Sequence, residues 1–343
     1  MSTTLKDRWR ATLKARYMID ETDERSRECL DEWVGTLEGI YKDFIRKDAR
    51  GQSISDPSFE DKIHNGTGRQ YEQCLAEMLF FDRLRRERFN LTPVGGAGPD
   101  FKASKNGVTV WFEVVTPEPD RDGEIERDLA DVSSRLHPSA GHSDAFRREL
   151  LFRITSSLDT KLKKLRGDVE KGNMNPSEPC VIVLNDSLLC PPDLYMFGVT
   201  HGAEAAYDSY WPLIAHATMA KGYSYRYPLP HPTESLWARA EPSDVLNKLN
   251  GSRAPINMAM FEDPTNAHVS AVLQITLRED YAYARQLERL AWAKAMTPVG
   301  GNMIEELHRG VLVRNPVATV TLPQLMWTKV WERRKDEPMR EPW

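Results

Sequence analysis

The spacing of apolar residues predicts three helices in the first half of the chain. Residues 28–44 carry apolar side chains three or four positions apart, which is the spacing of one helix face. The same spacing recurs over residues 68–88, which end in the arginine-rich stretch DRLRRERF, and over residues 145–171. Gly172 and Asn173 are typical of a helix C-terminus, so we expect the third helix to end there.

Alternating or continuous apolar runs predict the strands. A short strand at 89–94 precedes a hairpin, in which Asn106-Gly107 is a strong signal for a two-residue turn. The second strand of this hairpin, residues 108–115, is rich in aromatic and β-branched side chains. The run PCVIVLN at 179–185 is apolar throughout, as in a strand buried on both faces. Two later apolar runs are expected to form further strands: 269–275 and 310–315.

The order helix, three strands, helix, strand predicts an α/β fold. We divide the chain into a helical N-terminal extension, a core and a C-terminal elaboration of unknown role: residues 1–60, 61–187 and 188–343. The acidic stretch at 118–144 is rich in Pro and Gly and is expected to be a long surface insertion. Helices are expected near 202–216 and 278–294, and the polar tail beginning at Thr328 is expected to fray.

Composition excludes several classes of protein. The 343 residues are 40% hydrophobic and 28% charged, which is ordinary for a soluble domain, and no apolar run reaches membrane-spanning length. The four cysteines show no metal-ligand spacing and favour a reducing cytoplasm. A net charge of −5 argues against coating nucleic acid through overall charge, but it allows a local basic face. Zinc-hydrolase histidine spacings, a Walker A loop and a GxGxxG fingerprint are all missing from the sequence.

One charge interrupts the apolar strand at 108–115. A lone carboxylate at Glu113 is costly unless something compensates it, and a divalent cation does so well. Asp100 follows a Gly-Gly-Ala-Gly-Pro turn on the preceding strand, so the two residues predict a metal site on adjacent strands. The competing interpretations are that Asp100 is a turn residue and that Glu113 is an edge charge or a structural partner of Lys161.

The pair Pro99-Asp100 followed by Glu113, within an αβββαβ order, resembles the PD-(D/E)XK nuclease superfamily. The resemblance covers about residues 68–186 and implies a restriction-endonuclease-like core, a mixed sheet flanked by helices. It implies that Asp100, Glu113 and the backbone carbonyl of Val114 bind Mg²⁺, for which Mn²⁺ can substitute. The family's helical glutamate would be Glu72, a further ligand and catalytic residue, with Glu77 as the fallback.

The sequence departs from this family at its lysine. The family lysine should stand two residues after the glutamate, where this chain has Val115. Lys161 is the replacement that we favour, because it falls inside the apolar stripe of its own helix. Its neighbours Lys163 and Lys164 are expected to be solvated, and Lys102 on the first hairpin strand is the runner-up. The alternatives are that Lys161 only snorkels to solvent, or that the site is inactive.

The resemblance implies a Mg²⁺-dependent phosphodiesterase that cleaves DNA, in restriction or in defence against foreign DNA. Lys102, Arg147 and Arg153 would contact the nucleic acid, and the arginines at the end of the helix at 68–88 could add to a basic face. Cleavage of both strands would favour a homodimer, and no membrane partner is expected. Two alternatives stay open: an inactive nuclease-fold module that binds nucleic acid or protein, and a C-terminal half that recognises a partner for which the nuclease domain is the effector.

Overall fold

The computed structural model describes about two thirds of the chain. The described residues are 4–118 except 67 and 97, 144–189, 260–285 except 284, most of 310–333, and short pieces between 214 and 257; of residues 144–150 the backbone alone is described. Three expected segments lie wholly or largely outside them: the insertion at 118–144 and the helices near 202–216 and 278–294. No helix in the described part is long and apolar enough to cross a membrane.

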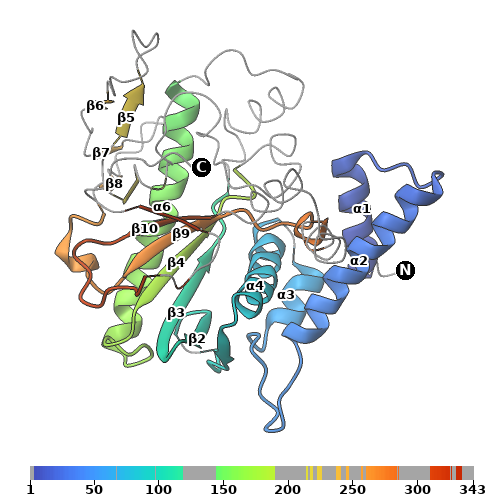
Figure 1. Ribbon diagram of the computed structural model, residues 1–343, viewed down its shortest axis with the longest axis horizontal. Helices are drawn as coiled ribbons and strands as arrows, with labels where there is room; N and C mark the ends of the chain where they lie inside the picture. The colour runs from blue at the N-terminus through green and yellow to red at the C-terminus, as the bar shows by residue number, and fades with distance from the viewer. Residues whose placement is uncertain are drawn as a thin grey trace.

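A seven-stranded mixed sheet lies at the centre of a mixed α/β fold, in the order β1-β2-β3-β4-β9-β10-β11. Figure 1 labels its strands β2, β3, β4, β9 and β10. Its strands are β1 (Asn90–Thr92), β2 (Phe101–Lys105), β3 (Val108–Val115), β4 (Cys180–Asn185), β9 (Ala271–Ile275), β10 (Gly310–Arg314) and β11 (Val330–Arg333). β3, β4 and β9 run parallel to one another, whereas β1–β2, β2–β3 and β9–β10 are antiparallel pairs. β11 is parallel to β10. Four short strands form two separate pairs: β5 (Gly222–Tyr225) with β6 (Trp237–Ala240), and β7 (Val245–Leu246) with β8 (Ile256–Asn257).

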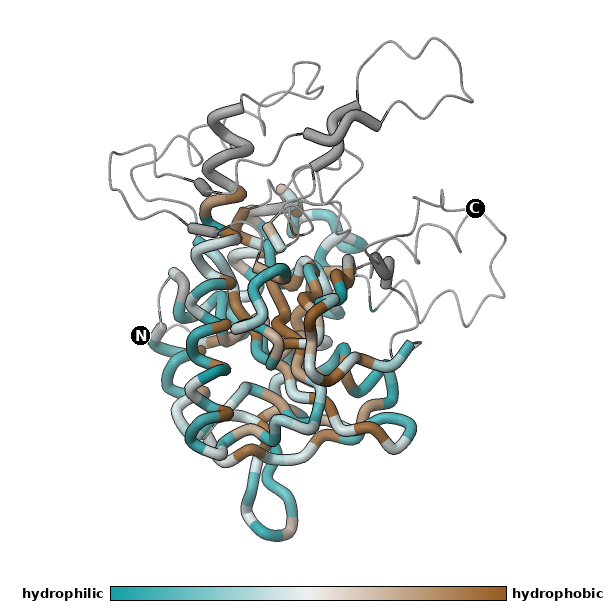
Figure 2. Tube along the Cα trace, turned by 90° about the vertical axis from the view of Figure 1, so that its left-hand side faces the viewer, coloured by the Kyte–Doolittle hydropathy of each residue, from teal (hydrophilic) through white to brown (hydrophobic). Residues whose placement is uncertain are grey.

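Helices cover both faces of the sheet. One face carries α1 (Leu5–Tyr17), α2 (Glu24–Phe44), α3 (Phe59–Asn65) and α4 (Arg69–Arg86), and the other carries α6 (Asp144–Glu170). A short 3₁₀ helix, η2 (Pro264–Asn266), precedes β9. Figure 2 shows the hydrophobic residues gathered along the central strands, with hydrophilic residues on the outer helices and loops.

The side chains of β3 point alternately to the two faces of the sheet, and each face has its own hydrophobic core. Phe112 and Val114 pack in the hydrophobic cluster on the α4 side, whereas Trp111 and Val115 pack in the cluster on the α6 side. Successive side chains of a strand point to opposite faces, so Glu113 points toward α6 together with Trp111 and Val115. This alternation decides which helix can supply a partner for the Glu113 carboxylate.

Most elements expected from the periodicity are confirmed. The three helices are α2, α4 and α6, and the expected strands are β1 to β4, β9 and β10. The expectation of a frayed tail is wrong at Val330–Arg333, which form β11. The reason is that β10 offers an unpaired strand edge, with which Val330–Arg333 pair in parallel. Strands β9 to β11 therefore complete the same sheet that the hairpin begins.

The turn between β2 and β3 has the backbone that its sequence predicts. Asn106 and Gly107 both have positive φ, 54° and 79°, as a two-residue hairpin turn with right-handed strand twist requires. Gly107→Ala should therefore lower the free energy of unfolding by about 1 kcal/mol, because alanine is strained at this φ. Urea unfolding at 25 °C measures the change.

Gly167 supplies the control for this prediction. It lies inside α6, and like Gly107 it has no atom within 4 Å of the position that a Cβ would take. Gly167→Ala should stabilise the protein by up to about 1 kcal/mol, because alanine is the better helix former. Equal changes in the two variants would contradict the role assigned to the turn.

Candidate active site

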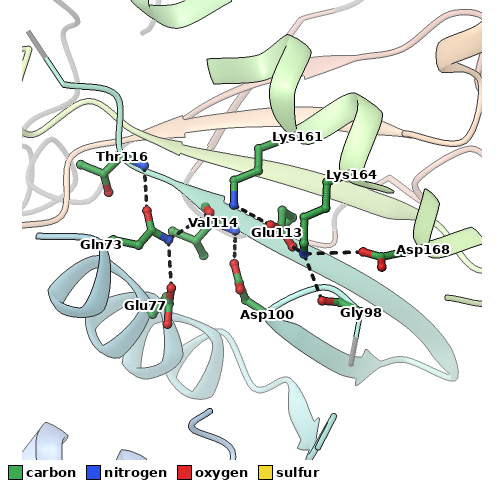
Figure 3. A network of polar contacts seen from close by, with 10 residues as sticks. All are labelled: Gln73, Glu77, Gly98, Asp100, Glu113, Val114, Thr116, Lys161, Lys164 and Asp168. Atoms are coloured by element: carbon green, nitrogen blue, oxygen red, sulfur yellow. Dashed lines mark hydrogen bonds and ion pairs between the residues drawn. The ribbon is translucent and has the colours of Figure 1, made fainter. Parts of the chain in front are cut away.

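The structure places Asp100 and Glu113 next to each other at one end of the hairpin (Figure 3). Phe101 pairs with Phe112 in the β2–β3 register, so the residue before β2, Asp100, stands opposite Glu113. Asp100 does not continue the ladder with its backbone. Its carboxylate Oδ2 instead accepts a hydrogen bond of 2.7 Å from the backbone N–H of Val114. This bond fixes the Asp100 carboxylate at the start of β2, beside that of Glu113.

Two lysines of α6 reach the carboxylate of Glu113, which is 0% exposed. The Lys161 ammonium donates to Oε1 at 2.6 Å, and the Lys164 ammonium donates to Oε2 at 2.6 Å. Residues three apart lie on one side of a helix, so α6 can present both lysines to β3. The structure thus brings Lys161 to the predicted pair of carboxylates, from a helix rather than from the strand position held by Val115.

The expectation that Lys164 is solvated is wrong. Its side chain is 39% exposed, but its ammonium pairs with Glu113, because Lys164 lies three residues after Lys161 and therefore on the same side of α6. Lys163 does point outward as expected, because its side chain is 69% exposed and pairs with Asp159 on the same helix at 2.6 Å. A helical wheel gives the direction of the Cα–Cβ bond, but a long side chain can reach well beyond it.

The glycine-rich turn before Asp100 lets the hairpin approach α6. Gly98 has a φ of 96°, and a Cβ there would lie 3.0 Å from the carbonyl oxygen of Asn173. A residue with a side chain would push the turn away from the end of α6. With glycine in place, the Gly98 carbonyl accepts a hydrogen bond of 3.0 Å from the Lys164 ammonium.

α4 contributes a third carboxylate through Gln73 and Glu77. The amide nitrogen of Gln73 donates to Glu77 Oε1 at 2.9 Å and to the carbonyl of Val114 at 3.1 Å. The amide oxygen of Gln73 accepts from the backbone N–H of Thr116 at 3.0 Å. Gln73 therefore joins α4 to the end of β3 and holds Glu77 near the site. The sequence signal for this pair is its spacing of four residues, which places both side chains on one helix face.

The negative charges of the site's carboxylates repel one another. Burial raises the pKa of Asp100 well above its usual range, the charges of Glu113 and Glu77 raise it further, and Lys161 and Lys164 offset part of the rise. Burial also raises the pKa of Glu77, although Gln73 and Lys161 act in the opposite direction. Burial alone would lower the pKa of Lys164, but Glu113 more than compensates and the net pKa is raised. Such a cluster of negative charge is stabilised by nearby cations.

Comparison of the chain with protein-family models, with curated proteins and with solved structures found no match.

The glutamate of α4 whose charge raises the pKa of Asp100 is Glu77, the alternative named from the sequence, and not Glu72. Glu72 lies more than one turn earlier on α4, beside Tyr71, whose pKa is raised chiefly by burial and further by Glu279 and Glu72. The physical reason is the rotation of α4. Gln73 faces the end of β3, and Glu72 is turned about 100° away from it, whereas Glu77 shares the Gln73 face.

The runner-up lysine, Lys102, has partners away from the carboxylates. The Lys102 ammonium lies 3.3 Å from a Glu178 oxygen and 4.6 Å from the centre of the Trp111 ring. Two residues along a strand is about 7 Å, and this separation takes Lys102 away from the site. The guanidinium of Arg153 lies 5.7 Å from the Phe152 ring centre, and the side chain of Arg147 lies outside the described residues.

The arginines at the end of α4 are engaged within the protein. Arg83 is buried and lies 3.2 Å from Glu87, and Arg85 pairs with Asp43 at 2.6 Å. Arg86 donates to the hydroxyl of Tyr281 at 3.2 Å. Arg83, Arg85 and Arg86 thus have structural partners, and their contacts do not favour a phosphate-binding role for these three residues.

The donor atoms of the site suit a hard cation, although the side chains are held by other partners. Within the described residues, no group of three or more His, Cys, Asp or Glu is arranged to hold a metal ion. The cause is visible: both Glu113 oxygens accept from lysines, and Asp100 Oδ2 accepts from the Val114 N–H. None of the hydrogen bonds between described residues involves Asp100 Oδ1 or Glu77 Oε2. These oxygens are the kind of ligand that Mg²⁺ prefers, as is the Val114 carbonyl, which here accepts from Gln73. The donor types therefore fit the ion, and binding would require at least one lysine to leave Glu113.

Proposed function

We propose that this protein is a Mg²⁺-dependent nuclease that hydrolyses phosphodiester bonds of DNA, as in restriction or defence against foreign DNA. One observation carries the proposal: the Lys161 ammonium lies 2.6 Å from Glu113, beside Asp100, although the strand position for a lysine holds Val115. A lysine from a sequence-distant helix beside the two carboxylates supports the proposal, because phosphodiester cleavage benefits from a cationic group near the reacting phosphate.

The order of elements around the site supports a restriction-endonuclease-like core. α4, β1, β2, β3, α6 and β4 follow one another in the expected αβββαβ order, with β3 and β4 parallel and adjacent. The carboxylates come from the hairpin and from α4, and the lysines come from α6. On this proposal β9 to β11 are additions to the far side of that core.

The residues of the site have distinct roles in the proposed reaction. Asp100, Glu77 and the Val114 carbonyl would hold the cation, together with Glu113 once a lysine has left it. The bound ion would lower the pKa of a water molecule and screen the charge of the phosphate. Glu113 positions the Lys161 ammonium, which would orient the attacking water and stabilise the negative charge that develops on the phosphate oxygens.

A second candidate is a nuclease-fold module without catalysis. Both oxygens of the buried Glu113 are paired with ammonium groups, and this arrangement satisfies the charge without any metal ion. Such a protein would bind nucleic acid or another protein and would leave the phosphodiester bond intact.

Incubation of the purified protein with plasmid and with single-stranded DNA separates the two candidates. Cleavage is expected with Mg²⁺ or Mn²⁺ and is expected to stop with EDTA. Asp100→Asn, purified in the same way, controls for a contaminating nuclease. Binding of DNA without cleavage in any metal would favour the inactive module, and equal cleavage by Asp100→Asn would show that the activity has another source.

A further inference from the structure

Three acceptors surround the Lys164 ammonium, and one of them, Asp168 Oδ2, accepts no hydrogen bond from the described residues. The distances are 2.6 Å to Glu113 Oε2, 3.0 Å to the Gly98 carbonyl and 3.5 Å to Asp168 Oδ2. Asp168 is 7% exposed, and its Oδ2 is buried without a hydrogen-bond partner among the described residues. Buried polar atoms in proteins normally have a partner, so a buried acceptor that faces an ammonium at this distance needs an explanation.

Lys161 and Lys164 differ in their freedom to leave Glu113. The Lys161 side chain is 19% exposed and its ammonium donates to Glu113, whereas Lys164 is 39% exposed and already touches the Gly98 carbonyl. Lys164 can therefore exchange one carboxylate for another without losing all its partners. Closing the gap to Asp168 to a charge-assisted bond of about 2.8 Å needs only a small rotation of the side chain.

We propose that the Lys164 ammonium holds the place of the cation at Glu113 in the metal-free protein and withdraws to Asp168 when a divalent cation binds. The inference rests on the proposed function, because it takes the Asp100–Glu113 pair to be the metal site. Lys164 and the metal compete for the same oxygen, and their like charges prevent both from occupying it. Asp168 receives the displaced ammonium, and the ion pair of 3.5 Å between them then shortens to the hydrogen bond that the buried oxygen lacks here (Figure 3).

This exchange makes metal binding depend on two residues that the metal does not touch. Without a cation, Lys164 closes the site and neutralises the buried Glu113. With a cation, the Lys164–Asp168 pair leaves the carboxylate to the metal. Lys164 and Asp168 are therefore positioning residues, and their effect should be measurable as metal affinity in the absence of DNA.

The test is a titration of the full chain with Mn²⁺, in which electron paramagnetic resonance measures the free ion. Lys164→Met should tighten Mn²⁺ binding about tenfold, because the competitor is gone, and Asp168→Asn should weaken it about tenfold, because the ammonium loses its alternative acceptor. The double variant should bind like Lys164→Met, since Asp168 acts through the lysine. Lys163→Met removes an exposed lysine from the same helix and should leave the affinity unchanged.

The outcomes separate this inference from the proposed function. If the wild-type protein binds Mn²⁺ but Lys164→Met binds it no more tightly, the exchange is refuted while the metal site stands. If neither the wild-type protein nor any variant binds Mn²⁺, the metal site and the exchange both fail. Thermal unfolding checks that each variant is folded, and Asp168→Asn, which keeps both lysines, decides the question if Lys164→Met does not fold.

Discussion

Lys161→Met should lower the rate of Mg²⁺-dependent DNA cleavage by about 10²–10⁴-fold at saturating metal, the range expected for loss of a general acid–base or positioning group. Methionine keeps the apolar stem of the side chain on α6. Glu113 keeps Lys164 at 2.6 Å, so the buried carboxylate is not left alone and the protein should fold. Single-turnover cleavage of a plasmid measures the rate, and thermal unfolding of the same sample measures folding.

Lys163→Met is the matched control, since it makes the same change two residues away on the solvent side of α6. Its cleavage rate should equal that of the wild-type protein. A Lys161→Met rate within tenfold of the wild-type rate would mean that Lys161 is only a counter-ion for Glu113. In that case the protein would still be a nuclease, but the role proposed for Lys161 in its chemistry would be refuted.

Asp100→Asn should abolish cleavage, by at least about 100-fold, and should make the protein more stable at pH 8. The loss follows from removing a charged oxygen ligand of the proposed metal site. The gain follows from the raised pKa of Asp100, because the folded state binds this proton more tightly than the unfolded state does. The asparagine oxygen can still accept the hydrogen bond from the Val114 N–H.

The sign of the stability change can be followed with pH. Below the unfolded pKa of Asp, about 4, both states are protonated and Asp100 has no effect on stability. As pH rises toward the folded pKa the penalty grows, and above that pKa it is complete. Urea unfolding should therefore show a gain for Asp100→Asn at pH 8 that shrinks toward pH 4.5.

Asp159→Asn serves as the control for this gain. It neutralises a carboxylate of α6 that pairs with Lys163 at the surface, so it should neither stabilise the protein at pH 8 nor slow cleavage. Lower stability of Asp100→Asn at pH 8 would show that the lysines more than compensate the burial of Asp100. Glu113 offers no test of this kind, because its removal would leave two ammonium groups without their carboxylate.

Local rules predict the part of the site that depends on local geometry. Glu113 stands out because a single charge interrupts an apolar strand, and Lys161 stands out because it lies in the apolar stripe of α6. Both signals arise within one element. The choice of Glu77 over Glu72 depends instead on how α4 is rotated against β3, which the contacts of Gln73 determine. The contact of Lys164 is not predicted by local rules, because it depends on how α6 is seated on the sheet beside Glu113.

The fold also has a part that local patterns predict and a part that depends on contacts between distant segments. Periodicity identifies β9 and β10 as strands, but their places in the sheet follow from pairing between segments far apart in the sequence. β11 has no strong signal of its own, and its formation depends on the edge of β10. The sequence pattern reports how a segment is buried, whereas the identity of its neighbour is decided by the whole assembly.

The parallel pairing of β4 with β9 has a consequence for the synthesis of the protein. All residues of both strands are buried, and β9 begins at Ala271, long after β4 ends at Asn185. Ribosomes add about 5–20 residues per second, so on the order of ten seconds separate the two strands during translation. Throughout that interval the nascent chain exposes an apolar strand edge that can pair with other chains. A chain that stopped at residue 187 would keep that edge open permanently. The part of the protein that carries the site therefore depends for its solubility on β9, whose residues take no part in the site.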